Sequence, residues 1–135
     1  MLKQLSPIVL LNIIQKTIEK NIGVKCYLDQ PNNIEPPFYF LELKEKKVND
    51  SETMYKLIYT VLVHVIVEMT GSSVPVEDYI QMLEEAMNED IIISDGFQLI
   101  MQFNNGTQTI KTDNANEEHA MLEYMFDVCN GYKCK

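Results

Sequence analysis

A β-branched stretch from Met54 to Met69 limits the possible folds of this chain more than any other segment. Seven of the thirteen residues from Leu57 to Met69 are β-branched, a composition that favours a strand over a helix. Polar residues recur at every fourth position, which would suit a helix nearly as well, so the β-branched content decides between the two. The prediction is one long strand with a wholly apolar face: Tyr55, Leu57, Tyr59, Val61, Val63, Val65 and Val67.

Two amphipathic segments are predicted to be helices. Ser6-Pro7 is a typical helix start and Gly23 a typical stop, which gives a helix over residues 7–22. Pro75 opens a second helix that runs to about Asn88, with acidic residues in its first turn, where the helix dipole favours them. Each segment has apolar residues along one side, so each helix is expected to pack on a sheet.

Shorter apolar segments on both sides of the long strand are predicted to be further strands. Val24 to Leu28 ends in turn residues, and Pro36-Pro37 leads into a strand from Phe38 to Lys44. After the second helix, the chain is expected to form strands over 97–103 and 107–112. Asn104-Asn105-Gly106 between them is a strong hairpin signal.

The last apolar segment, His119 to Asn130, contains good helix formers. Its apolar residues nevertheless alternate strictly with the others, which favours a strand. Residues 130–135 then form a C-terminal tail.

Between two of the predicted strands, residues 45–53 are polar and charged, with no glycine for a tight hairpin. The prediction for residues 44–53 is a flexible arm or loop. The whole chain of 135 residues is long enough for a real core but short for two domains. We therefore predict a single α+β domain over 1–135, with a mostly antiparallel sheet, a long central strand and two helices packed on one face.

Charge is distributed unevenly along the chain. Residues 1–50 carry a net charge of +1 and residues 51–135 a net charge of −10. All basic residues are lysine, and the absence of arginine argues against a specific nucleic-acid reader. The longest apolar run, Leu57 to Met69, is short for a membrane span and contains Thr60, His64 and Glu68, so no membrane segment is expected. The N-terminus lacks a secretory signal pattern, which predicts a cytoplasmic protein.

The sequence offers no pattern typical of catalysis, and no metal or cofactor is predicted. His64 and Glu68 share a strand face about 13 Å apart, too far for a proton relay or a common metal. His64 is interpreted as a half-buried sheet residue, and His119 as a residue at a loop-to-strand junction. Cys26, Cys129 and Cys134 are interpreted as free thiols, although the last two could close a small loop.

The order of these elements resembles that of the tail-terminator and tail-completion proteins of long-tailed bacteriophages. The resemblance extends over nearly the whole chain. It rests on the first helix, the short strand that ends at Pro31, the Pro-Phe-Tyr-Phe entry at 37–40, the polar arm, the long strand, the second helix and the final strand from His119. The resemblance implies a structural, non-enzymatic protein of a phage or prophage that forms a hexameric ring, caps the tail tube and joins it to the head.

The resemblance also implies partners and a contact surface. The partners would be other copies of the chain, the tail tube protein and a head-connector protein, with DNA passing non-specifically through the lumen. The protein would reside in the host cytoplasm before assembly and in the virion afterwards. The arm would contact a neighbouring subunit or the tube through Lys44, Lys46, Lys47, Asn49, Asp50 and Glu52.

Two other classes of protein remain as alternatives. One is a cytosolic adaptor or inhibitor that binds a single partner by strand addition at the Met54–Met69 edge. The other is a small hydrolase or ligand-binding domain.

Overall fold

The computed structural model describes residues 2–69, 74–94, 96–113 and 116–133. It contains two helices, α1 (Pro7–Ile22) and α2 (Val74–Ala86), and five strands. The strands are β1 (Cys26–Tyr27), β2 (Phe38–Val48), β3 (Met54–Glu68), β4 (Gln98–Thr112) and β5 (Glu117–Tyr132). The α+β class is as the sequence predicts.

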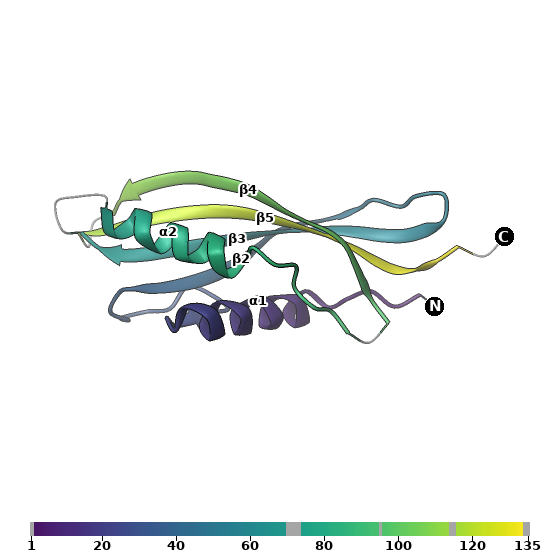
Figure 1. Cartoon of the computed structure of the whole chain (residues 1–135), viewed down its shortest axis with the longest axis horizontal. Helices are drawn as coiled ribbons and strands as arrows, with labels where there is room; N and C mark the ends of the chain where they lie inside the picture. The colour runs from purple at the N-terminus through teal and green to yellow at the C-terminus, as the bar shows by residue number, and fades with distance from the viewer. Residues whose placement is uncertain (1, 70–73, 95, 114–115, 134–135) are drawn as a thin grey trace.

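The five strands form one sheet in the order β1-β2-β3-β5-β4. β1 pairs with β2 in parallel, and the other three pairings are antiparallel. β3 is therefore bonded along both sides, to β2 and to β5. Figure 1 shows the result, a long twisted sheet that extends at one end well beyond the two helices.

The core lies between the helices and one face of the sheet. Leu10, Ile14 and Ile18 of α1, with Val76, Ile80 and Leu83 of α2, belong to the same buried cluster as the alternate residues of β3 and β5. From β5 the core cluster takes Ala120, Leu122, Tyr124, Phe126 and Val128, the set whose alternation predicts a strand. The preference for a strand over a helix at 119–130 is confirmed.

The predicted boundaries of α1 are confirmed, and Gly23 ends the helix in the left-handed region with a φ of 80°. A glycine suits that position because it lacks the Cβ that makes a left-handed backbone unfavourable for other residues. The Gly23 amide donates to the Glu19 carbonyl at 3.0 Å, which satisfies one of the last helix carbonyls.

The predicted hairpin at Asn104-Asn105-Gly106 is wrong. These residues lie inside β4, and the register against β5 shifts between Asn104 and Gly106. Gly106 has a φ of 83°, and its amide donates to the Asn104 Oδ1 at 2.8 Å. Asparagine and glycine with positive φ serve a bulge as well as a turn, and a bulge bends a strand without reversing it. The two predicted strands 97–103 and 107–112 are thus one.

Two other boundaries also differ from the prediction. β2 continues past Lys44 to Val48, and β5 continues past Asn130 to Tyr132. Residues 44–48 are therefore paired with β3 rather than forming a loop, and part of the predicted tail is strand. Polar residues conceal a strand here because both faces of this ribbon are largely solvated, so hydrophobic alternation is lost. The possible Cys129–Cys134 loop lies outside the described residues, while Cys26 and Cys129 are free and buried.

Candidate interaction surfaces

The end of the sheet beyond the helices forms a projecting ribbon, which we call the arm. It consists of the end of β2, the turn at 49–53 and the start of β3, with the end of β5 alongside. The Ser51 amide donates to the Met54 carbonyl at 3.0 Å, and the Ser51 Oγ accepts from the amides of Thr53 and Met54 at 3.3 and 3.0 Å. A serine therefore closes the turn that lacks a glycine.

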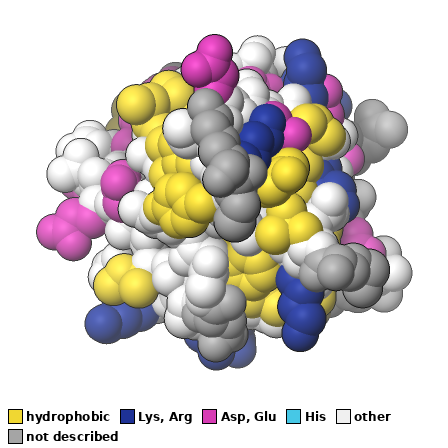
Figure 2. All heavy atoms as spheres, turned by 90° about the vertical axis from the view of Figure 1, so that its right-hand side faces the viewer, with side chains coloured by type: hydrophobic (Ala, Val, Ile, Leu, Met, Phe, Trp, Pro, Cys, Tyr) yellow, Lys and Arg dark blue, Asp and Glu magenta, His cyan; other side chains and the backbone are white. Residues whose placement is uncertain are grey.

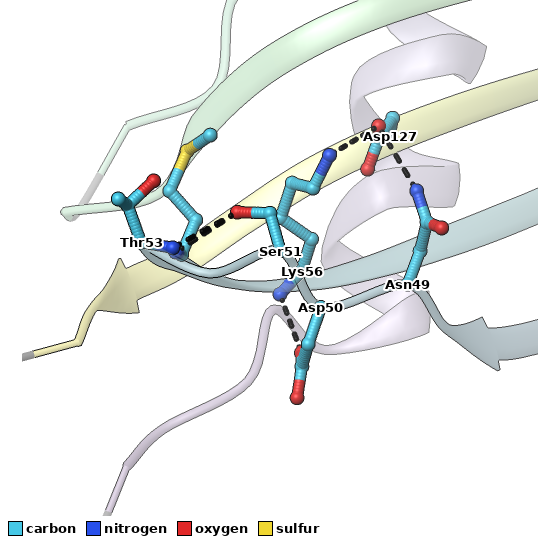
Figure 3. Close-up of polar contacts among 7 residues, drawn as sticks. Asn49, Asp50, Ser51, Thr53, Lys56 and Asp127 are labelled. Carbon is cyan, nitrogen blue, oxygen red and sulfur yellow. Dashed lines mark hydrogen bonds and ion pairs between the residues drawn. The ribbon is translucent and has the colours of Figure 1, made fainter.

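The base of the arm is held by a nearly buried ion pair, shown in Figure 3. Lys56 Nζ lies 3.3 Å from Asp127 Oδ2, and only 14% and 10% of the two side chains are exposed. The Asn49 side chain also donates to Asp127 Oδ2, at 3.4 Å. The Asp50 carboxylate accepts from the Lys56 backbone amide at 2.9 Å. These contacts tie the turn to both neighbouring strands, so the arm is a defined element.

The N-terminal segment lies against the inner face of the arm. The Tyr59 hydroxyl donates to the Leu5 carbonyl at 2.6 Å, and the Leu5 amide donates to Asn130 Oδ1 at 3.4 Å. Lys46 Nζ donates to Gln4 Oε1 at 3.2 Å. Through these three contacts, residues 4 and 5 are bonded to β2, β3 and β5. The segment before α1 therefore supports the part of the sheet that extends beyond the helix.

The predicted contact residues of the arm fall into two groups. Lys44, Asn49 and Asp50 are engaged within the chain, and Lys44 forms an ion pair with Glu123 at 2.9 Å that raises the pKa of the lysine. The side chains of Lys47 and Glu52 are exposed, and neither side chain makes a hydrogen bond or ion pair with the part of the chain that the structure describes. Lys46 makes one exposed contact. The structure brings the six together on one ribbon but leaves only Lys46, Lys47 and Glu52 available to a partner.

Apolar side chains also gather at this end of the molecule, as Figure 2 shows. The arm and its neighbours contribute Leu2, Val48, Tyr55 and Tyr132, of which 48, 65, 39 and 63% are exposed. Exposed apolar groups rimmed by lysines are typical of a surface that contacts another protein. Sequence reasoning missed this group because these residues are scattered along the chain and meet only in the sheet.

A second cluster lies on the face of the sheet opposite the helices. His64 Nε2 lies 2.8 Å from Glu42 Oε1, and His64 Nδ1 lies 2.7 Å from His119 Nε2. The Phe40 ring stacks on His64 with centroids 4.2 Å apart and an interplanar angle of 3°. This arrangement is consistent with neutral imidazoles, with His119 donating to His64 and His64 donating to Glu42.

The two histidines resist protonation. Burial lowers the pKa of His64, and the hydrogen bond to Glu42 offsets only part of that effect. Burial also lowers the pKa of His119, with a further contribution from His64. His64 is more buried than predicted, with 7% of the residue exposed. Sequence reasoning missed the pair because the register of β3 against β5, which brings His119 beside His64, is not visible in the sequence.

A groove of about 750 Å³ lies between the two helices and the segment after α2. Exposed lysines of α1, Lys16 and Lys20, line one part of it. Acidic residues line another part: Glu85 near the end of α2, and Glu89 and Asp90 in the segment that follows. Among the described residues, no group of three or more His, Cys, Asp or Glu side chains is arranged to hold a metal ion. No helix in that part of the chain is long and apolar enough to cross a membrane.

The described residues thus form an α+β domain whose sheet projects as a partly apolar arm. The chain belongs to the family described as "Putative tail termination protein", whose model matches residues 1–135. The family resemblance predicted from the sequence is thereby confirmed, and the chain is a structural protein of the phage tail.

Among solved structures, the chain is similar to a chain from the "Virion of native gene transfer agent (GTA) particle". The TM-score is 0.67 at 13% sequence identity, over 83% of this chain and 84% of that chain. At this identity, the likeness shows a shared fold. No curated protein matches the sequence.

Proposed function

We propose that this protein is a tail terminator that forms a ring, caps the finished tail tube, stops its growth and joins the tail to the head. The observation that supports this most is the family match over residues 1–135. Six copies per ring follow from the family resemblance. The partners are other copies of the chain, the tail tube protein and a head-connector protein. The protein acts without catalysis, in the host cytoplasm before assembly and in the virion afterwards.

The arm is the proposed contact surface. Its exposed Lys46, Lys47 and Glu52 can meet a neighbouring molecule, whereas Lys44, Asn49 and Asp50 shape the arm through contacts within the chain. An arm whose shape is fixed before binding loses less conformational entropy in the contact than a flexible loop would. This supports a role in repeated, uniform contacts between subunits.

The acidity of the molecule also fits the passage of DNA. The net charge of the chain is −9. Like charge suppresses adhesion of the DNA phosphates, because binding to DNA depends on neutralising them with lysine or arginine. A ring of such chains would let DNA slide through its lumen without specific contacts.

The adaptor alternative loses its proposed binding edge. Strand addition needs an unpaired edge, but β3 is hydrogen-bonded to β2 on one side and to β5 on the other. The described edge strands are the two-residue β1 and β4. β4 carries three register shifts against β5, and such irregularities disfavour pairing with another strand.

The proposal is tested by the mass of the purified protein, measured by light scattering from micromolar to millimolar concentration, with negative-stain images of the same samples. We expect a species of about six subunits and ring-shaped particles at the upper concentrations. Addition of purified tail tubes should place the rings at tube ends. A protein that stays monomeric at every concentration and leaves tube ends bare would contradict the proposal.

A further inference from the structure

The groove between the helices has two oppositely charged sides and an apolar centre. Its basic side is formed by α1 and its acidic side by the end of α2 and the residues that follow. Ile92, at the mouth of the groove, is 86% exposed, more than any other large hydrophobic residue described as exposed. Further apolar lining comes from Ile13, Ile22, Met82, Ala86 and Ile91. A surface of this composition is complementary to a segment that carries both charges around an apolar residue.

The arm carries this combination. Lys46 and Lys47 are exposed on its β2 strand, and Glu52 is exposed in its turn. Between them lies Val48, 65% of which is exposed. Lys46 and Val48 pair with the core residues Tyr59 and Leu57 and share one face of the sheet, whereas Lys47 lies on the other face. Lys46 matches the acidic side of the groove, Glu52 matches the basic side, and Val48 matches the exposed Ile92. The Glu52 side chain has no polar partner within the described residues, and Lys46 has one exposed contact, with Gln4, to exchange on binding.

The arm of a chain does not meet the groove of the same chain. Figure 1 shows the arm extending away from both helices, and the backbone ladders of β2, β3 and β5 hold it there. A second copy of the chain can supply the arm. A contact in which one patch of each copy binds a different patch of the next is heterologous, and such contacts close into rings when the rotation between copies permits.

We propose that the arm of one copy docks in the helix groove of the next copy, with Lys46 facing Glu85 and Glu89, and Val48 against Ile92. This inference rests on the proposed ring and identifies the surfaces that form it. It assigns a role to the groove, which sequence reasoning did not single out because its lining comes from two helices far apart in the chain.

Charge exchange is the first test. The variants Lys46→Glu/Lys47→Glu and Glu85→Lys/Glu89→Lys place like charges across the contact, and each should raise the concentration needed for ring formation at least about tenfold. All four substitutions in one chain restore the complementary pairing, so rings should form again near the wild-type concentration. The matched control, Lys25→Glu/Glu35→Lys, changes exposed charges outside the arm and the groove. It should assemble normally.

Cross-linking is the second test. Val48→Cys and Ile92→Cys are combined in one chain with Cys134→Ser, which leaves the buried Cys26 and Cys129 as the other thiols. Mild oxidation should give disulfide-linked oligomers that end at a closed ring, whereas each single-cysteine variant should give at most dimers. Circular dichroism and the melting temperature establish that every variant is folded.

The outcomes separate this inference from the proposed function. If both charge-reversed variants form rings as the wild type does, and no Val48–Ile92 cross-link forms, the docking model is overturned. The proposed ring itself would then still stand. The docking model is also overturned if the reversed variants fail to assemble and the fourfold variant does not recover. If the wild type forms no ring, either alone or at tube ends, the proposed function fails, and the docking model is then judged by cross-linking at millimolar concentration. Linked dimers there would support the contact, and their absence would reject it.

Discussion

At the residue scale, the His64–His119 pair is a pH-sensitive contact on the face of the sheet opposite the helices. The two nitrogens lie 2.7 Å apart, and one must donate while the other accepts. If both rings are protonated, two N–H groups and two positive charges face each other. Glu42 from β2 favours the charge on His64, whereas Lys111 from β4 opposes it on both rings, and Asp113 favours it on His119.

This pair predicts that stability falls as the pH drops. Both histidines have a pKa below the ordinary value of 6.5 in the folded chain, so the unfolded chain binds protons more readily. The stabilisation is present above about pH 6.5 and is lost progressively below it, as the pH falls toward the folded pKa values. We expect the melting temperature to decrease by on the order of a few °C between pH 7.5 and 5.5.

Calorimetry of a variant checks this assignment. In His64→Gln/His119→Gln, two groups that titrate in this window are absent, so the decrease between pH 7.5 and 5.5 should be clearly smaller than in the wild type. The single variant Lys111→Gln removes a positive charge that lowers both histidine pKa values, so it should bring the folded pKa values closer to 6.5 and make the decrease smaller. An unchanged pH profile in the double histidine variant would show that the pair does not control it.

Asp127 and Lys56 give a second prediction at this scale. Asp127→Ala leaves the Lys56 ammonium and the Asn49 amide without their acceptor in a nearly buried site. We expect the free energy of unfolding to decrease by about 1–3 kcal/mol, because a buried polar group then lacks a partner. Lys56→Met in the same chain removes the unpaired ammonium and should recover part of that loss.

Urea denaturation of the two single variants and the double variant measures the coupling. Asp127 Oδ1 is buried without a hydrogen-bond partner among the described residues, which reduces the net benefit of the pair. A coupling energy near zero in this double-mutant cycle would mean that the Lys56–Asp127 ion pair makes no net contribution to the free energy of unfolding.

At the element scale, the arm combines a weak sequence signal with a defined structure. Residues 44–53 contain mostly polar and charged side chains, yet the strands continue to Val48 and restart at Met54. Backbone pairing on both sides of β3 and the contacts of Asn49, Asp50 and Ser51 define the arm. Few core side chains come from it, so we expect the arm to contribute little to stability.

Deletion of Glu45–Ser51 is therefore predicted to leave a folded monomer that cannot assemble. Leu57 at the base of the arm is part of the core cluster, whereas residues 45–50 are all exposed. The core and both helices should persist, and the melting temperature should decrease only moderately. Circular dichroism measures whether the variant is folded, and light scattering measures whether it assembles. A deletion variant that unfolds, or one that still forms rings, would contradict the prediction.

At the scale of the whole molecule, the fold places the two proposed contact surfaces far apart. The arm lies at the end of the sheet that extends beyond both helices (Figure 1), whereas the groove is lined by residues of the two helices and of the segment after α2. A molecule with its two contact surfaces at separate positions is suited to head-to-tail assembly rather than to a two-fold dimer, in which one patch would meet itself. This arrangement agrees with the proposed ring and with the expected six-subunit mass.

Local sequence signals were sufficient to predict the α+β class, the bounds of α1 and the strand character of residues 54–68 and 119–130. Ser6-Pro7 and Gly23 mark the helix ends, and the alternation of apolar residues marks a half-buried strand. The family resemblance also followed from the order of elements along the chain.

The remaining features depend on the tertiary structure, because they are set by which strands are neighbours. The register of β3 against β5 brings His64 to His119, and the pairing of β2 and β5 with β3 turns a polar segment into an arm. The Asn-Gly signal became a bulge because β5 pairs with β4 on both sides of it. Such long-range pairings leave no local trace in polar residues, whose side chains are solvated in a loop and a ribbon alike.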